Sequence, residues 1–137
     1  MAQIIVDAGP LVALLDEDDK DHAWATEQSR ELPESVITCD AVLTETFFLI
    51  SKNIIAGRHL HRLLRDGKII SKFPSHLHLD RILELMETYR NIPMSFADAC
   101  LVCMVENNPA STLFTLDRDF TVYRQQRRRI IPLIAPF

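Results

Sequence analysis

Glycine is scarce in this chain, with only Gly9, Gly57 and Gly67 among 137 residues. They lie too far apart to form the glycine-rich loop that P-loop and dinucleotide-binding folds use to hold phosphate. No apolar run reaches the length of a membrane-spanning helix, and the first residues lack the basic region that opens a signal peptide. These absences disfavour a nucleotide-binding fold and predict a protein that does not enter a membrane.

Cysteine is also scarce, and Cys39, Cys100 and Cys103 all have apolar neighbours. An odd number of cysteines in such surroundings argues against a disulfide framework and favours the reducing cytoplasm. The 19 acidic and 15 basic side chains give a net charge of −4, which excludes a general polyanion-binding protein but is compatible with a local basic patch. The length is typical of one domain, so we expect a single domain over residues 1–137.

No lysine follows Lys72. Receiver domains and haloacid-dehalogenase-like phosphatases place an acid after their first strand, as Asp7 is placed here, and use a late lysine to neutralise phosphate. The tripeptide Asp7-Ala8-Gly9 also lacks the second acid of the phosphatase motif. Aspartyl phosphotransfer is therefore disfavoured.

Short apolar segments alternate with helical patterns along the chain. Asp40 can cap a long helix and Gly57 can end it. We expect strands over 3–6, 36–38, 68–72, 112–116 and 130–134, and helices over 11–15, 23–31, 40–55, 58–65, 79–89, 95–107 and 119–126. Strands that alternate with helices predict an α/β fold with a parallel sheet covered on both faces.

Four carboxylates occupy positions where an isolated charge is costly. Asp7 and Asp117 follow two expected strands, at the sheet edge where α/β proteins bind ligands. Glu45 and Asp98 each share an expected helix face with apolar residues, which for Glu45 include Phe48. Acids that converge repel one another unless a cation joins them, and oxygen-rich sites suit Mg²⁺ or Mn²⁺. Two such ions can clamp the attacking and leaving oxygens in phosphodiester hydrolysis.

Each acid also has a structural alternative. Asp7 and Asp117 can cap the helices that follow them, and Ser95 with Asp98 fits a capping box. Glu45 has the weakest alternative, because no basic residue lies three or four positions away. The four acids together favour a site more strongly than any one of them alone.

The acids belong to four segments that resemble motifs of a known family. The segments are IIVDAGPLVALL, AVLTETFFLI, MSFADACLVCMVE and TLFTLDRDF, which carry Asp7, Glu45, Asp98 and Asp117 in that order. In order and spacing they resemble the PIN-domain family, especially the VapC-type toxin ribonucleases of bacterial toxin–antitoxin pairs. The segment DDKDHAWA is similar to the family's polar segment before the next helix, so the resemblance covers nearly the whole chain.

The resemblance implies a PIN-like three-layer sandwich, in which helices flank a central parallel sheet of about five strands. It also implies a Mg²⁺- or Mn²⁺-dependent endoribonuclease that forms no covalent intermediate and acts as a toxin. Because the family includes inactive scaffolds, the alternative is a PIN-fold RNA-binding or interaction module with little or no nuclease activity.

The same resemblance assigns roles to particular side chains. It implies that catalysis and metal binding depend on Asp7, Glu45, Asp98 and Asp117. Thr115 would be a supporting polar member of the cluster. Asp119 would either reach the metal through water or cap the helix that follows.

Two groups of basic residues could meet RNA. Arg58, Arg62 and Arg65 share one expected helix face, and a run at 127–129 has Arg118 and Arg124 upstream. A solvated surface is the ordinary interpretation of both groups. The alternative is that one of them guides an RNA backbone to the acids. If the first group does so, neutralising it should reduce the salt dependence of RNA binding.

The segment 40–65 carries more large apolar residues than one core-facing side requires, among them Phe47, Phe48, Ile54 and Ile55. The surplus predicts a second covered surface, either a homodimer contact or a groove for an antitoxin segment. The resemblance to VapC-type toxins implies an antitoxin that blocks the site.

Overall fold

A sheet of five parallel strands forms the centre of the computed structural model, which describes residues 3–137. The strands are β1 (Ile4–Val6), β2 (Val36–Thr38), β3 (Ile69–Ser71), β4 (Thr112–Phe114) and β7 (Leu133–Ile134), in the order β3-β2-β1-β4-β7. In register, Ile5 of β1 lies beside Ile37 of β2 and Leu113 of β4. The predicted α/β fold with a central parallel sheet is confirmed.

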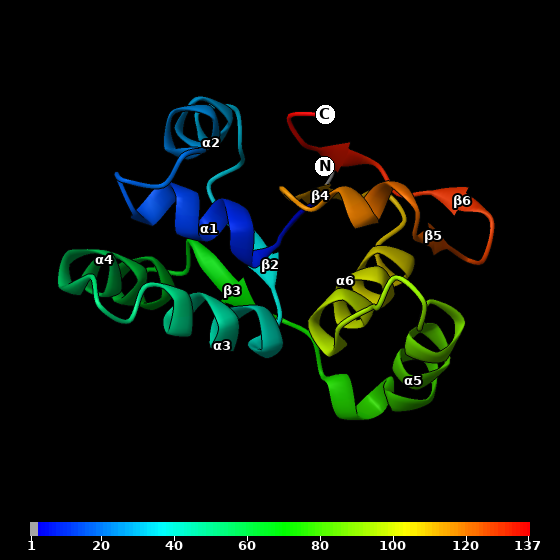
Figure 1. Cartoon of the computed structure of the whole chain (residues 1–137). Helices are drawn as coiled ribbons and strands as arrows, with labels where there is room; N and C mark the ends of the chain where they lie inside the picture. The colour runs from blue at the N-terminus through cyan, green and yellow to red at the C-terminus, as the bar shows by residue number, and fades with distance from the viewer. Residues whose placement is uncertain (1–2) are drawn as a thin grey trace.

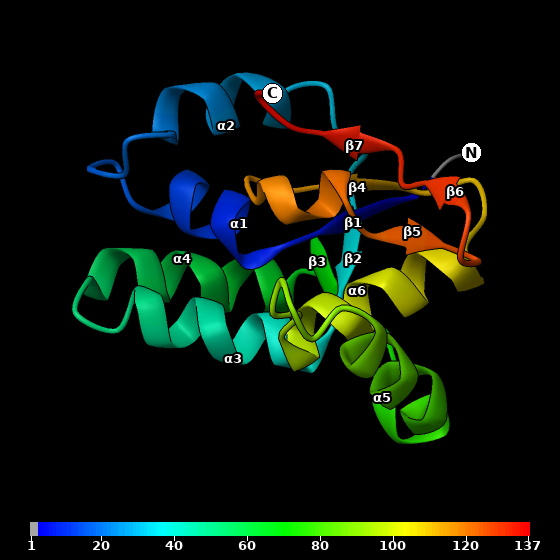
Figure 2. The same ribbon diagram turned by 45° about the vertical axis from the view of Figure 1, so that its right-hand side comes forward.

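Helices flank this sheet on both sides (Figures 1 and 2). They are α1 (Ala8–Leu15), α2 (His22–Ser29), α3 (Asp40–Leu49), α4 (Ile54–Arg65), α5 (Leu79–Thr88) and α6 (Phe96–Asn107), with short 3₁₀ helices η1 (Ser75–Leu77) and η2 (Arg118–Thr121). Helix α1 contacts α2, α3 and α4, whereas α5 packs on α6, which in turn contacts β1 and β4. No helix within residues 3–137 combines the length and apolar character that crossing a membrane requires.

The central strands are rich in β-branched residues, because helices cover both faces of the sheet. Ile5, Val6, Ile37 and Leu113 are all buried. The one polar side chain among the buried residues of β1, β2 and β4 is Thr38, whose hydroxyl donates to the carbonyl oxygen of Val6 at 2.7 Å. The core is therefore apolar up to the carboxyl ends of the strands, where polar residues begin.

The expected long helix over 40–55 is wrong, because the chain forms two helices there. Asn53 caps α4 by accepting a hydrogen bond from the Ala56 N–H at 3.0 Å, so a new helix begins at Ile54. Gly57 lies inside α4 and does not end a helix. Asp40 is the first residue of α3 and not its cap, and its carboxylate accepts a hydrogen bond from the Ser71 hydroxyl.

The region after β4 also differs from expectation. Instead of a helix over 119–126, η2 is followed by a hairpin of β5 (Arg124–Gln125) and β6 (Arg129–Ile130). Its turn places Gln126 and Arg127 in the left-handed region, with φ of 50° and 68°. The Gln126 N–H donates to the carboxylate of Glu106 on α6 at 2.6 Å. This long-range bond holds a turn that local propensity disfavours.

The first helix begins earlier than the sequence indicated. We expect this helix over 11–15, but α1 starts at Ala8. Gly9 and Pro10 therefore lie in its first turn, where proline is tolerated because its missing N–H would have no partner. A Cβ at Gly9 would lie 3.3 Å from the Cβ of Leu116, so this glycine allows α1 to approach the loop after β4.

Candidate active site

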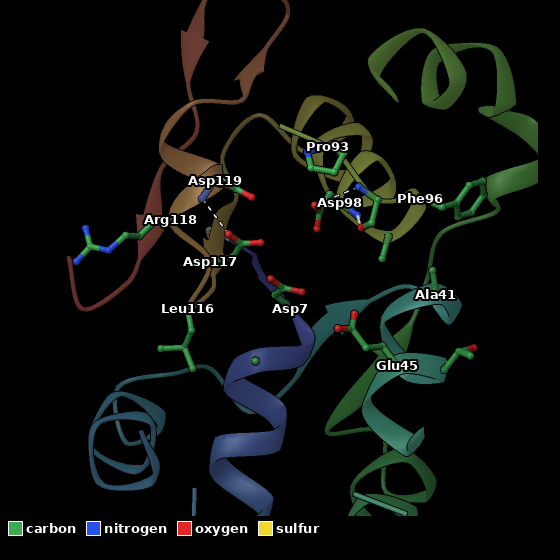
Figure 3. Close-up of a pocket in the computed structure, with 14 residues that line it drawn as sticks. Asp7, Ala41, Glu45, Pro93, Phe96, Asp98, Leu116, Asp117, Arg118 and Asp119 are labelled. Carbon is green, nitrogen blue, oxygen red and sulfur yellow. Dashed lines mark hydrogen bonds between the residues drawn. The ribbon is translucent and has the colours of Figure 1, made fainter. Parts of the chain in front are cut away.

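The carboxyl edge of the sheet holds a pocket of about 890 Å³ whose lining includes five acidic side chains (Figure 3). They are Asp7 before α1, Glu45 on α3, Asp98 on α6, Asp117 before η2 and Asp119 in η2. The structure thus gathers all five predicted acids from segments that are far apart in sequence. Asp7 and Asp117 meet because the strands β1 and β4 are parallel and end at the same edge, and α3 and α6 bring Glu45 and Asp98 to it.

Asp7 is both a helix cap and a member of the pocket. Its Oδ1 accepts the Ala8 N–H at 2.7 Å, which caps α1, and its Oδ2 accepts the Thr115 hydroxyl at 2.8 Å. The residue is only 8% exposed. Burial raises the pKa of Asp7 to about 7, against the opposing effect of the two hydrogen bonds, and the charges of Asp98 and Glu45 raise it further. The two alternatives that the sequence left open for this residue are therefore compatible.

Thr115 connects two of the acids. Its buried hydroxyl donates to Asp7 and accepts the backbone N–H of Asp117 at 3.0 Å. Asp117 then caps η2, because its Oδ1 accepts the Asp119 N–H at 2.9 Å. The cap before this short helix is thus Asp117, and Asp119 lies within the helix with its side chain at the pocket.

Asp98 forms three hydrogen bonds at the start of α6, accepting two of them and donating one. Ser95 and Asp98 form the predicted capping box, in which the Ser95 hydroxyl accepts the Asp98 N–H at 3.0 Å and Asp98 Oδ2 accepts the Ser95 N–H at 3.3 Å. The same Oδ2 accepts the hydroxyl of Tyr123 at 3.2 Å. Burial raises the pKa of Asp98, and the charge of Asp117 adds to this, although these bonds oppose the shift.

Tyr123 was not identified from the sequence. Its side chain is fully buried, and its ring contacts the rings of Tyr89 and Phe120 at centroid distances of 5.0 and 5.1 Å. The helix expected over 119–126 did not indicate which part of the protein the Tyr123 side chain would contact. The only signal available was a tyrosine close to the apolar Phe120 and Val122, which does not indicate which acid it would meet.

Glu45 lines the pocket, but not for the reason that the sequence indicated. We expected it on a core-facing apolar stripe. The buried face of α3 is instead formed by Val42 and Thr46, while Glu45 and its neighbour Phe48 are exposed. The apolar residues beside Glu45 form an outer surface, so this carboxylate meets the pocket from its solvent side.

In the part of the chain that the structure describes, no basic side chain forms an ion pair with any of the five acids. Repulsion between converging carboxylates favours tighter proton binding by at least one of them. The pKa values of Asp7, Asp98 and Asp119 are indeed raised, but burial is the largest cause for each and the neighbouring carboxylates are secondary.

The donor set of the pocket is one of carboxylate oxygens, which suits a hard divalent cation. Within the described part of the chain, no three Asp, Glu, His or Cys side chains lie close enough to hold one metal ion together. Mg²⁺ commonly binds through one or two carboxylates and keeps several waters, so the spread of the side chains around the pocket fits an ion of this kind. Asp7, Glu45, Asp98, Asp117 and Asp119 are the residues that could hold it.

Apart from Arg118, the predicted basic groups lie outside this pocket. Arg58, Arg62 and Arg65 are exposed on α4, and Arg58 lines a second pocket of about 760 Å³ together with Ile54 and Ile55. The run at 127–129 is exposed on the β5–β6 hairpin. Arg118 lines the acidic pocket, which the sequence interpretation had not distinguished from the rest of its group.

Comparison with known proteins agrees with this fold. A family model described as PIN domain matches residues 4–125, and the chain therefore belongs to the PIN-domain family. Among solved structures, the chain is similar to the Mycobacterium tuberculosis toxin VapC20, which is described as a sarcin-ricin loop cleaving toxin. The two share 20% sequence identity with a TM-score of 0.76, over 95% of this chain and 100% of that chain. No curated protein sequence matches the chain.

These findings confirm the predicted family resemblance and the PIN-like fold. At this level of identity the likeness to the toxin concerns the fold. The activity must therefore be argued from the site.

Proposed function

We propose that this chain is a Mg²⁺- or Mn²⁺-dependent endoribonuclease that hydrolyses RNA phosphodiester bonds, and that it acts as the toxin of a type II toxin–antitoxin pair. The observation that carries the proposal is a pocket in a PIN-family chain that gathers five carboxylates without a basic partner. Such a site favours a cation from solution and, through it, a phosphate. The likeness to a toxin that cleaves the sarcin-ricin loop supports RNA as the substrate class.

In this proposal the side chains hold oxygen ligands in place for the reaction. Thr115 fixes Asp7 and the backbone at Asp117, and Ser95 and Tyr123 fix Oδ2 of Asp98. A bound divalent ion supplies positive charge that activates water and neutralises the charge developing on the phosphate. The raised pKa of Asp7 means that cation binding competes with its proton near neutral pH.

The decisive experiment is cleavage of a panel of single-stranded and structured RNAs with Mg²⁺ or Mn²⁺, with EDTA, and with the variants Asp7→Asn and Asp98→Asn. We expect cleavage by the parent protein with either ion and none with EDTA. Because loss of a residue that only orients a ligand costs about 10–100-fold, each variant should be at least about 100-fold slower. Asp40→Asn is the matched control, since Asp40 lies on α3 outside the pocket lining.

Two results would contradict the proposal. If Asp7→Asn and Asp98→Asn cleave as fast as the parent, the assignment of the site is wrong. If the parent binds RNA but cleaves none of the panel with either ion, the chain is a PIN-fold binding module, which is the alternative that the sequence left open.

A partner surface is part of the proposal. Phe48, Leu49, Ile54 and Ile55 on α3 and α4 are 54–78% exposed. All of them except Phe48 line the second pocket. We propose that a second copy of the chain covers this surface in a homodimer, in keeping with the large exposed apolar area. Light scattering of the parent and of Phe48→Ser with Ile55→Ser should show a dimer that becomes a monomer. A monomeric parent would leave the surface for the antitoxin.

The remaining expectations belong to the same proposal. We propose that the PIN-like domain extends over all of residues 1–137, beyond the matched range 4–125. A cytoplasmic location fits an RNA substrate and three buried cysteines that are free thiols. Protease digestion of the folded protein should leave the whole chain intact if the first proposal holds, whereas early loss of residues after 125 would contradict it.

A further inference from the structure

Arg118 is the basic residue that lines the acidic pocket of the described chain. It lies between Asp117 and Asp119 in sequence, yet it forms an ion pair with neither of them. Its guanidinium lies over the ring of Phe137, with Cζ 4.7 Å from the ring centroid. Figure 3 shows the Arg118 side chain directed away from the acidic side chains.

This orientation is unexpected for an arginine beside five acids. Coulomb attraction would draw an unrestrained guanidinium toward Asp117 or Asp119. An arginine paired in that way would neutralise the carboxylates and compete with a divalent cation for them. The aromatic face of Phe137 offers the guanidinium another partner, and a cation over an aromatic face is stabilised by the ring quadrupole. Phe137 therefore keeps positive charge at the rim of the pocket and out of its centre.

A guanidinium at the rim of a negative pocket suits one class of ligand. RNA brings phosphates to the pocket, and five carboxylates repel them. Arginine donates parallel hydrogen bonds to phosphate oxygens, keeps its charge at all relevant pH values and can remain stacked on a ring while it does so. Arg118 provides attraction for the strand at the edge of the site, separate from the oxygen ligands at its centre.

We propose that Arg118, held in place by Phe137, binds a backbone phosphate of the RNA strand next to the bond that is cleaved. The inference rests on the proposed ribonuclease function and assigns to it a substrate-binding residue. Arg118 is the binding residue, and Phe137 is a positioning residue that acts through it.

The test is equilibrium binding of a 2′-O-methyl copy of the RNA that the parent cleaves, so that binding is measured without cleavage. Arg118→Ala should bind about tenfold more weakly, as expected for one charged hydrogen-bonded contact. Between about 50 and 200 mM KCl, its log–log salt slope should be smaller by about 0.7, the value for one phosphate of a single strand. Arg118→Lys keeps the positive charge but loses the planar guanidinium that donates two parallel hydrogen bonds. Its affinity for the RNA copy should therefore lie between those of Arg118→Ala and the parent.

Arg30→Ala is the matched control. Arg30 is an exposed arginine after α2 that pairs with Glu27 and does not line the pocket. Its removal changes the net charge equally, and binding should stay within about twofold of the parent. Thermal melting of each variant should match the parent, because both arginines are exposed.

The role of Phe137 is tested by a double-mutant cycle. Phe137→Ala should weaken binding less than Arg118→Ala does, and the double variant should bind no more weakly than Arg118→Ala alone. A further loss in the double variant would mean that the ring contacts RNA itself, which contradicts a role through Arg118.

The two proposals fail in different ways. If the parent cleaves RNA but Arg118→Ala binds the copy with the parent's affinity and salt slope, the inference about Arg118 is wrong and the ribonuclease function stands. If the parent cleaves no RNA, the proposed function is wrong. The affinities of the parent and of Arg118→Ala for the uncleaved panel RNAs are then compared, and equal affinities would show that Arg118 does not contact RNA.

Discussion

Two buried carboxylates in this protein have opposite surroundings. Glu106 on α6, with a side chain 7% exposed, accepts two hydrogen bonds from the guanidinium of Arg81 at 3.0 and 2.8 Å and one from the Gln126 N–H. Asp7, a residue 8% exposed, accepts bonds only from neutral donors, the Ala8 N–H and the Thr115 hydroxyl. The chain balances the first charge internally and leaves the second without a counter-charge.

This difference distinguishes Glu106, a structural acid, from Asp7, which we propose to be functional. Glu106 joins α5, α6 and the β5–β6 hairpin, and the pKa of Arg81 is raised mainly by its hydrogen bonds to this carboxylate. Burial without a cation instead raises the pKa of Asp7 to about 7. A buried charge that the chain itself does not balance indicates where a cation from solution is expected.

The largest expected effect is a pH dependence of stability caused by Asp7. Its pKa is 3.8 when unperturbed and about 7 in the folded protein, so the folded state binds this proton more tightly than the unfolded state. The stabilisation from this bound proton is complete below the unperturbed pKa of 3.8 and is lost as pH rises through the folded pKa of about 7. At 1.36 kcal/mol per pKa unit, the loss in metal-free protein approaches about 4 kcal/mol.

Urea denaturation with EDTA at several pH values measures this effect. The difference in unfolding free energy between the parent and Asp7→Asn should change across the interval from the unperturbed to the folded pKa. Added Mg²⁺ should restore stability to the parent at neutral pH and leave Asp7→Asn unchanged. Parallel pH profiles for the two proteins would show that Asp7 carries no unbalanced charge. Asp40→Asn, outside the pocket, should follow the parent.

Removing the internal counter-charge should have the next largest effect. Arg81→Ala leaves Glu106 buried and unpaired, and we expect the unfolding free energy to fall by about 3 kcal/mol. Arg30→Ala, which breaks the exposed pair with Glu27, is the control and should have little effect. A loss for Arg81→Ala as small as that of the control would mean that Glu106 is not stabilised by its pairing.

A smaller effect is expected where a neutral donor orients a pocket acid. Tyr123→Phe keeps the ring contacts with Tyr89 and Phe120 and removes only the hydroxyl that donates to Asp98. Because it misorients one carboxylate, kcat for RNA cleavage should fall about tenfold with KM unchanged, and more Mg²⁺ should be needed for half-maximal rate.

Tyr89→Phe is the control for this change. The Tyr89 hydroxyl accepts the Arg124 N–H at 3.1 Å, so its loss tests a partly buried hydroxyl away from the acids. Both variants should have nearly the same thermal stability as each other. If they reduce kcat equally, the effect of Tyr123 is one of packing and not of positioning Asp98.

The smallest effect should come from the outer part of the Arg81 network. Arg127 pairs with Glu84 at 3.1 Å, but the side chains are 77% and 46% exposed. Arg127→Ala should therefore leave the urea midpoint unchanged within error, because exposed pairs contribute little. A clear fall in the midpoint would show that the hairpin depends on this outer contact as well as on the Gln126–Glu106 bond.

Parts of the site followed from sequence because they depend on position along strands. Asp7 and Asp117 follow two parallel strands, so any fold that pairs those strands brings them to one edge. The capping box of Ser95 and Asp98 is a local pattern and formed as expected. Thr115 was expected in the cluster from the family resemblance, and it lies between Asp7 and Asp117.

Other features could not be predicted, because they depend on contacts between distant segments. Glu45 was expected on a buried stripe, since periodicity alone does not say which face of α3 meets the core. The helix expected over 119–126 was displaced by the bond from Gln126 to Glu106, twenty residues away. The long helix over 40–55 was a different error, since Asn53 was a local signal that the apolar pattern obscured.

By itself, the sequence determined the α/β class with a central parallel sheet, the family and the acids that reach the sheet edge. These depend on hydrophobic patterns and on residues next to them in the chain. Only the tertiary structure decided that Asp7 has Thr115 as its partner across 108 residues, that Tyr123 contacts Asp98, and that Arg118 lies on Phe137. The balance of charge at a buried site is a sum over groups that folding brings together, so it is determined only once the whole chain is packed.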